Sequence, residues 1–270
     1  MNPAAPAWVA AVRGSHERLR ALVGRLTQDQ LVWPAYPQDW TIAQVMAHLG
    51  AGAEVFIGRV NAVRAGGSDP GRDEYESTRL AWSAKSADNQ ATDSIATNQR
   101  LVELFEELVG GAGAHLRFNV VGRELDLAGL ASIRLSELTI HYWDIAVALD
   151  PSATLAAPSV ALLIDVTPQI VIRARWRPIG VEPLPPVSGP SRVHVVTTGP
   201  AREFSLALGE KVRLGPWPGE SGPHAPAELH LPAEALVRLI FGRLDPEHTP
   251  AEVIATGVEL DTLRAAFPGF

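Results

Sequence analysis

The 270-residue chain contains no cysteine, and this absence sets the first limits on its chemistry. Without a thiol the chain forms no disulfide, offers no thiolate ligand to a metal and has no cysteine nucleophile. Any thiol chemistry therefore has to use a thiol supplied by another molecule. Lysine is scarce as well, because only Lys85 and Lys211 occur among the 23 basic residues. This arginine bias, with many alanines and glycines, is typical of a GC-rich genome.

Long hydrophobic runs and clusters of positive charge are also missing. Asp165, Pro168 and Gln169 interrupt the longest apolar stretch, so no segment reaches the ~20 apolar residues of a membrane-spanning helix. The N-terminus lacks the basic and apolar regions of a signal peptide. A net charge of −7 without a basic run argues against nucleic-acid binding. We therefore expect a cytoplasmic monomer or homodimer with a small-molecule substrate and neither nucleic-acid nor membrane partners.

The first half of the chain has the hydrophobic periodicity of helices. Apolar residues recur at helical spacing in residues 7–26, 42–65, 91–109 and 127–149. Thr41, with Gln44 three residues later, is typical of a capping box that begins the second of these helices. No strand pattern separates the helices, and the polar residues 73–90 favour a loop with a short helix. The pattern predicts a four-helix bundle.

The second half alternates between strand and helix patterns. Residues 192–198, 203–208, 211–214, 227–231 and 258–260 are predicted as strands. Helices are expected at residues 158–176, with an interruption near Pro168, and at residues 232–242 and 261–267. The fold class is thus α followed by α+β, in which a small, mainly antiparallel sheet carries helices. We place the domain boundary between residues 152 and 153, giving domains 1–152 and 153–270.

Glu137 and His141 form the pattern with the clearest chemical meaning. Four residues apart on a helix, they lie on one face, one turn apart, where both can reach the same metal ion. This face is otherwise apolar, and an unpaired carboxylate is costly to bury there. His48, in the middle of the second helix, can supply a third ligand. Two histidines and one carboxylate leave coordination positions open, as in catalytic metal sites, and Asp144 can accept the ring N–H of a ligand.

Ordinary structural roles explain the same residues without a metal. Glu137 could pair with Arg134 at the surface, and His48 could be a hydrogen-bonded core histidine. His16, on the first helix, is expected to face solvent. Four tryptophans either line a pocket or belong to the core, which is the more common place for tryptophan in a helical domain; they are Trp33, Trp40, Trp82 and Trp143.

Two stretches resemble a known family. Residues 39–49 (Asp-Trp-Thr-Ile-Ala-Gln-Val-Met-Ala-His-Leu) resemble the start of the second helix of DinB-like bundles. Residues 134–144 carry Arg, Glu, His and Asp at the offsets of their fourth helix. More narrowly, the chain resembles the mycothiol-dependent maleylpyruvate isomerase family of actinobacteria. In that family a DinB-like bundle precedes a small domain similar to sterol-carrier proteins, and residues 153–270 look like that domain.

The resemblance implies a function and a set of site residues. It implies that His48, Glu137 and His141 bind a divalent metal, usually zinc. It further implies a low-molecular-weight thiol, mycothiol or a similar one, as cosubstrate of an isomerase or S-transferase that acts on a small electrophilic acid. The family has a functional arginine near the end of its second domain, and Arg243 is our candidate for that position, with Arg238 as the rival.

Two functions of other classes remain open at this point. One is metal-dependent hydrolysis, in which the metal activates water in place of a thiol. The other is a non-catalytic protein that holds a small apolar ligand in its second domain. A thiol bound at the metal would favour the thiol-dependent enzyme. An apolar tunnel in the second domain, without a metal at His48, would favour the binding protein.

Overall fold

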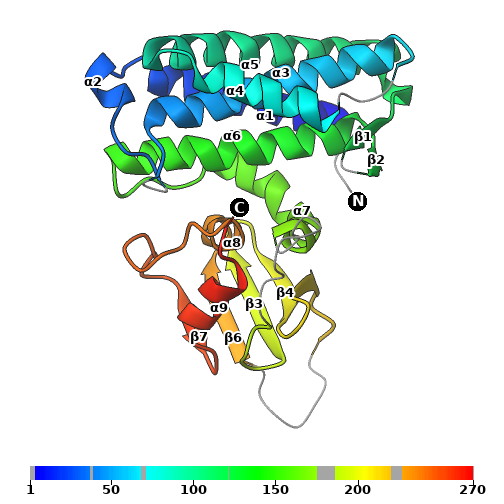
Figure 1. The fold of residues 1–270 in the computed structure, drawn as a ribbon. Helices are drawn as coiled ribbons and strands as arrows, with labels where there is room; N and C mark the ends of the chain where they lie inside the picture. The colour runs from blue at the N-terminus through cyan, green and yellow to red at the C-terminus, as the bar shows by residue number, and fades with distance from the viewer. Residues whose placement is uncertain are drawn as a thin grey trace. The chain divides into compact units, whose positions relative to one another are not determined.

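The computed structural model describes residues 4–36, 39–67, 71–120, 122–174, 186–219 and 227–269 (Figure 1). It separates into two compact units, Met1–Thr154 and Leu155–Phe270, and each unit is described by itself. None of the helices in the described residues is both long and apolar enough to cross a membrane. The predicted order, a helical first part followed by a second part built on a sheet, is confirmed.

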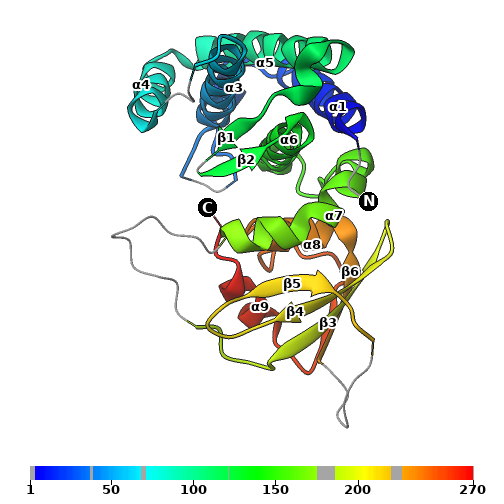
Figure 2. The same ribbon diagram turned by 90° about the vertical axis from the view of Figure 1, so that its right-hand side faces the viewer.

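Four long helices form the first unit and lie side by side (Figures 1 and 2). They are α1 (Ala5–Val23), α3 (Ile42–Arg64), α5 (Ala87–Gly110) and α6 (Leu127–Leu149). Within this bundle α3 packs mainly against α5, and α1 packs mainly against α6. Shorter helices complete the unit: α2 (Gln28–Leu31), α4 (Arg72–Ser83) and the 3-10 helix η1 (Ala112–His115).

The predicted capping box at the start of α3 is confirmed. The Thr41 hydroxyl accepts the Gln44 N–H at 3.2 Å, and the Gln44 side chain accepts the Thr41 N–H at 2.8 Å. Two otherwise unpaired N–H groups of the first turn are thereby satisfied. The capping box thus fixes the residue at which α3, the helix that carries His48, begins.

The region between the long helices differs from the prediction. A small antiparallel hairpin, β1 (Phe118–Val120) with β2 (Arg123–Leu125), stands where no strand was expected. Gly122, with φ of 75°, permits its turn. Helix α4 is longer than the short helix predicted, and α5 begins at Ala87, before residue 91, because Ser86 caps its first turn. Short strands and polar helices carry too little hydrophobic periodicity to be recognised in the sequence.

The second unit is a five-stranded sheet covered on one face by helices (Figure 2). The strand order is β5-β4-β3-β6-β7, in which β3 and β6 pair in parallel and the other neighbours are antiparallel. Alternate residues of the central strands point into the core, as Val193, Val195 and Leu229 do. The elements of this unit are α7 (Ala157–Ala174), β3 (Arg192–Thr198), β4 (Arg202–Ala207), β5 (Arg213–Pro216), β6 (Ala227–Pro232), α8 (Ala233–Ile240), β7 (Ile254–Thr256) and α9 (Leu260–Ala266).

Two details of the second unit were predicted wrongly. Helix α7 continues through Pro168 instead of breaking there. Proline lacks the N–H that would bond the Ile164 carbonyl, and the Thr167 hydroxyl donates to that carbonyl at 2.7 Å instead. The last strand is Ile254–Thr256, not residues 258–260, because Gly257 follows it with φ of 70° and helix α9 begins soon afterwards.

Helix α4 packs on α3, and one close contact between them, Trp82 against Gly50, yields a stability prediction. A Cβ added at Gly50 would lie 2.2 Å from the Trp82 ring. That ring is 2% exposed, and its Nε1 donates to Glu54 at 2.7 Å, so it cannot move aside cheaply. We expect Gly50→Ala to lower the free energy of unfolding by about 2 kcal/mol, the usual size for overpacking. Thermal and urea unfolding followed by circular dichroism measure this change.

Gly14→Ala is the matched control for this helix glycine. In α1 the added Cβ would meet its nearest atom, Nη1 of Arg18, at 3.5 Å, an ordinary van der Waals distance. Alanine has the higher helix propensity, so this variant should gain roughly 0.5–1 kcal/mol. Equal effects of the two substitutions would contradict the contact between Gly50 and Trp82. In a Trp82→Leu background, the cost of Gly50→Ala should largely disappear.

Candidate metal centre

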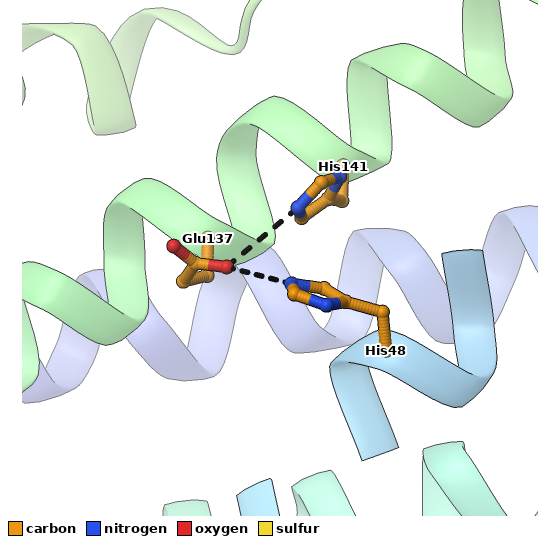
Figure 3. Close-up of side chains that lie close together, drawn as sticks. All are labelled: His48, Glu137 and His141. Atoms are coloured by element: carbon orange, nitrogen blue, oxygen red, sulfur yellow. Dashed lines mark hydrogen bonds and ion pairs between the residues drawn. The ribbon is translucent and has the colours of Figure 1, made fainter. Parts of the chain in front are cut away.

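The structure brings His48, Glu137 and His141 together in the first unit (Figure 3). His48 comes from α3, while Glu137 and His141 lie one turn apart on α6. One carboxylate oxygen of Glu137, Oε2, is 3.0 Å from Nε2 of His48 and 3.6 Å from Nε2 of His141. The three donor atoms all lie within 4.8 Å of one another. Two helices that are distant in sequence therefore bring together three side chains that could bind one metal ion.

The three side chains are sheltered but not sealed from solvent. The side chain of His141 is 13% exposed, that of His48 29% and that of Glu137 34%. A small molecule can therefore approach the cluster while the protein still excludes part of the surrounding water. Electrostatic interactions are stronger in such a place than at an open surface.

Asp144 orients the ring of His141 through Nδ1, the ring nitrogen that does not face Glu137. Its Oδ2 lies 2.8 Å from Nδ1 of His141, as expected from the spacing, and its side chain is fully buried. The carbonyl of Asp144 also accepts the N–H of Tyr36 at 3.0 Å. A carboxylate at Nδ1 keeps the proton on that nitrogen, so Nε2 is the atom presented to Glu137.

The charge of Glu137 and the protonation of His141 favour a cation between their donor atoms. Burial lowers the pKa of His141, but the hydrogen bond to Asp144 and the negative charge of Glu137 outweigh this effect and raise that pKa to about 9. Burial opposes ionisation of Glu137, whereas its interactions with His141 and His48 hold its pKa well below the usual value. A neutral His141 would point a lone pair at the Glu137 carboxylate. Either a proton or a metal ion has to lie between them, and two imidazoles with one carboxylate suit a divalent transition metal such as zinc.

Aromatic side chains stand beside the cluster. The Trp40 ring centroid lies 5.4 Å from that of His48 and 6.5 Å from that of His141, nearly parallel to the latter ring. Trp40 is 39% exposed, so it presents a flat apolar surface both to the imidazoles and to solvent. On α4, Tyr75 is 39% exposed, and partial desolvation and the negative charge of Glu137 raise the pKa of its phenol.

Of the other three tryptophans considered from the sequence, two lie in the core and one lies at the surface. Trp82 is 2% exposed and Trp143 is fully buried, as expected of core residues, whereas Trp33 is 46% exposed. Tyr75 was missed by the sequence analysis because its helix was expected to be largely a loop. Its position depends on how α4 packs, for which the sequence carries no local signal.

Two structural alternatives for the polar residues are wrong. His16 does not face solvent: it is fully buried on α1, where its Nε2 lies 3.0 Å from Oε1 of Gln99. It does not belong to the group of described residues that could hold a metal ion. Arg134 does not pair with Glu137 at the surface, because it is 1% exposed and donates to the Leu49 carbonyl.

Arg243 and Arg238 belong to the second unit, around the end of α8. Arg238 is 2% exposed, and its guanidinium donates to both carboxylate oxygens of Glu234, each at 2.8 Å. It also donates to the carbonyl of His248 at 2.7 Å. Arg243 is 7% exposed, and its Nη1 donates to the carbonyl of Phe241 at 2.7 Å. The bidentate pair with Glu234 gives Arg238 a structural role.

Comparisons with known proteins agree on one family. The model of the mycothiol maleylpyruvate isomerase N-terminal domain matches residues 12–146, half of the chain. Among solved structures, the crystal structure of a mycothiol-dependent maleylpyruvate isomerase is similar, with a TM-score of 0.66 and 13% sequence identity over 95% of both chains. A histidine-to-alanine mutant of such an isomerase gives the same TM-score and coverage at 12% identity. A search of curated protein sequences finds no significant match.

Proposed function

Because the chain belongs to the family defined by the mycothiol maleylpyruvate isomerase N-terminal domain, we propose that it is a metal-dependent, thiol-using enzyme. Its reaction is the isomerisation of a small electrophilic acid such as maleylpyruvate, or conjugation of that acid with the thiol. The thiol is mycothiol or a similar low-molecular-weight thiol. The convergence of His48, Glu137 and His141 supports this proposal most directly.

In this proposal the metal is zinc or a similar divalent ion, held by Nε2 of both histidines and by the Glu137 carboxylate. Bound there, the ion lowers the pKa of a coordinated thiol and so supplies a thiolate at neutral pH. Asp144 orients His141 through Nδ1 and increases the basicity of its other nitrogen. Trp40 shields one side of the cluster from water.

The protein's part in the reaction is to hold the thiol sulfur and the substrate at this partly sheltered point. The sulfur adds to one carbon of the cis double bond, and the pair of electrons of that bond moves onto the substrate's conjugated carbonyl. The former double bond is now single and rotates. Elimination of the same thiolate restores a double bond in the trans geometry, so atoms and charge balance and the thiol is recovered. In a conjugating enzyme the adduct takes up a proton and leaves as the product.

We further propose that Arg243 binds a carboxylate of the substrate. Arginine binds carboxylates through two parallel N–H donors, which suits an acidic substrate. The family resemblance supports Arg243 for this role, and Arg238, which pairs with Glu234, is the rival. The corresponding variant, Arg243→Met, should raise KM for the acid more than it changes the affinity for the metal.

An assay of cis–trans isomerisation tests the proposed function. Purified protein loaded with zinc is mixed with mycothiol and maleylpyruvate, and the change in ultraviolet absorption is followed. We expect turnover that requires the thiol and that a chelator removes and added zinc restores, because a metal held by these residues would supply the thiolate.

Controls separate this function from its two rivals. Turnover without any thiol, with water incorporated into the product, would identify a metal-dependent hydrolase instead. No turnover of any acid and no stoichiometric metal after reconstitution would contradict the enzyme and leave a ligand-binding role. Formation of a stable thiol adduct without isomerisation would select the S-transferase over the isomerase.

A further inference from the structure

Arg134 lies inside the helical bundle, one turn before Glu137 on α6, and is 1% exposed. Its Nη2 donates to the carbonyl oxygen of Leu49 at 2.8 Å and to Oδ1 of Asn98. Leu49 directly follows His48 on α3. This side chain therefore connects the turn that carries one candidate ligand to the turn that carries another.

The surroundings of the guanidinium join three helices at one point. Asn98, from α5, donates from Nδ2 to the carbonyl of Ser94 at 2.8 Å and approaches the Leu49 carbonyl at 3.5 Å. On α3, a Cβ at Gly52 would lie 3.1 Å from Nη1 of Arg134, closer than nearly all real contacts of that kind. The glycine thus leaves room for the guanidinium against the backbone of α3.

Removing the charged guanidinium of Arg134 from water is costly, so a buried arginine at this position implies a compensating role. Desolvation lowers the pKa of Arg134 to about 10, which still leaves the side chain protonated at neutral pH, and the charge of Glu137 partly offsets the burial. Its hydrogen-bond acceptors among the described residues are neutral oxygens. An apolar side chain would fill the same space with a smaller desolvation cost. What an apolar side chain cannot provide is the link to the Leu49 carbonyl.

We propose that Arg134 is a positioning residue for the metal centre, a role that rests on the proposed function of this site. Helix α3 packs mainly against α5 and has limited contact with α6, so few other contacts fix the separation of His48 from the other two candidate ligands. The bond from Arg134 to the Leu49 carbonyl sets that separation and the register of the two helices. A preorganised set of donors binds an ion more tightly than one that must rearrange.

Zinc affinity of folded variants tests this role. Arg134→Met keeps most of the side-chain volume and removes every donor, and we expect its zinc dissociation constant to rise by about 10- to 100-fold, as for other supporting residues around metals. Arg134→Lys keeps the charge and one donor that can reach Leu49, so it should recover part of the affinity. Competition with a chromophoric chelator gives the constants. Cobalt absorption spectra of the same variants report the geometry of coordination. The spectrum should change in Arg134→Met and return toward that of the wild type in Arg134→Lys.

Trp82→Leu is the control for a general loss of stability. It weakens the same unit by removing buried contacts between α4 and α3, and it adds no atom beside Leu49, so the folded variant should bind zinc as tightly as wild type. Wild-type zinc affinity and an unchanged cobalt spectrum in Arg134→Met would overturn the proposal, and if that variant does not fold, the same result in Arg134→Leu, which also lacks every donor, would do so. An equal loss of affinity in Trp82→Leu would also overturn it. Failure of the wild-type protein to bind zinc would instead contradict the proposed function itself.

Discussion

Replacing His141 by alanine is expected to reduce bound zinc from about one equivalent per chain to less than about a tenth, because a three-ligand site does not survive the loss of a ligand. His141 is the least exposed of the three candidate ligands and the one that Asp144 holds in orientation. Its removal leaves Glu137 and His48 with too few donors for tight binding. Elemental mass spectrometry of protein reconstituted with zinc and then desalted measures the metal content.

The loss has to be separated from unfolding, because His141→Ala also leaves the buried carboxylate of Asp144 without its imidazole. His48→Ala is the second variant, since His48 is 29% exposed and on another helix, and it should lose zinc in the same way. His194→Ala is the matched control: His194 pairs with Glu203 and stacks on Trp217 in the second unit. A full equivalent of zinc in folded His48→Ala and His141→Ala would contradict the assigned ligands.

The parts of the site that could be predicted are those with a local cause. Glu137 and His141 share a face because helical geometry alone places residues four apart on the same side. The start of α3, the helix that carries His48, follows from hydrogen bonds between Thr41 and Gln44. That the two helices would bring these residues together did not follow from spacing. It came from the resemblance to a family, and the geometry of the structure agrees with it.

The residues that were misjudged have roles that depend on partners distant in sequence. Arg134 is buried because α3 offers it a carbonyl and a glycine, and neither is recognisable as its partner from the sequence. His16 was expected at the surface because short-range periodicity does not show which polar group of a helix finds a buried partner, here Gln99. Pro168 continues its helix because a neighbouring hydroxyl supplies the missing hydrogen bond. In each case a specific tertiary or side-chain contact overrides a general preference.

Zinc affinity is expected to rise about tenfold for each unit of pH up to about 9, because the metal must displace the proton of His141. In the metal-free protein, the hydrogen bond to Asp144 and the negative charge of Glu137 outweigh burial and raise the pKa of His141 to about 9, while the Glu137 carboxylate stays ionised. Below that pH each zinc ion therefore releases one proton from His141, and above it the dependence on this residue ends. Competition titrations at several pH values measure the slope.

Stability of the metal-free protein should change in the opposite direction over the same range. The pKa of His141 is raised by folding, so its protonated form stabilises the fold fully below its ordinary value of 6.5, and this contribution is lost as the pH rises to about 9. Zinc should therefore protect against thermal unfolding more strongly as the pH increases. In Asp144→Asn the charge that raises the pKa of His141 is gone, so the zinc affinity should level off at a lower pH. A zinc affinity independent of pH in the wild-type protein would mean that the metal binds without displacing this proton, and that Nε2 of His141 is not a ligand.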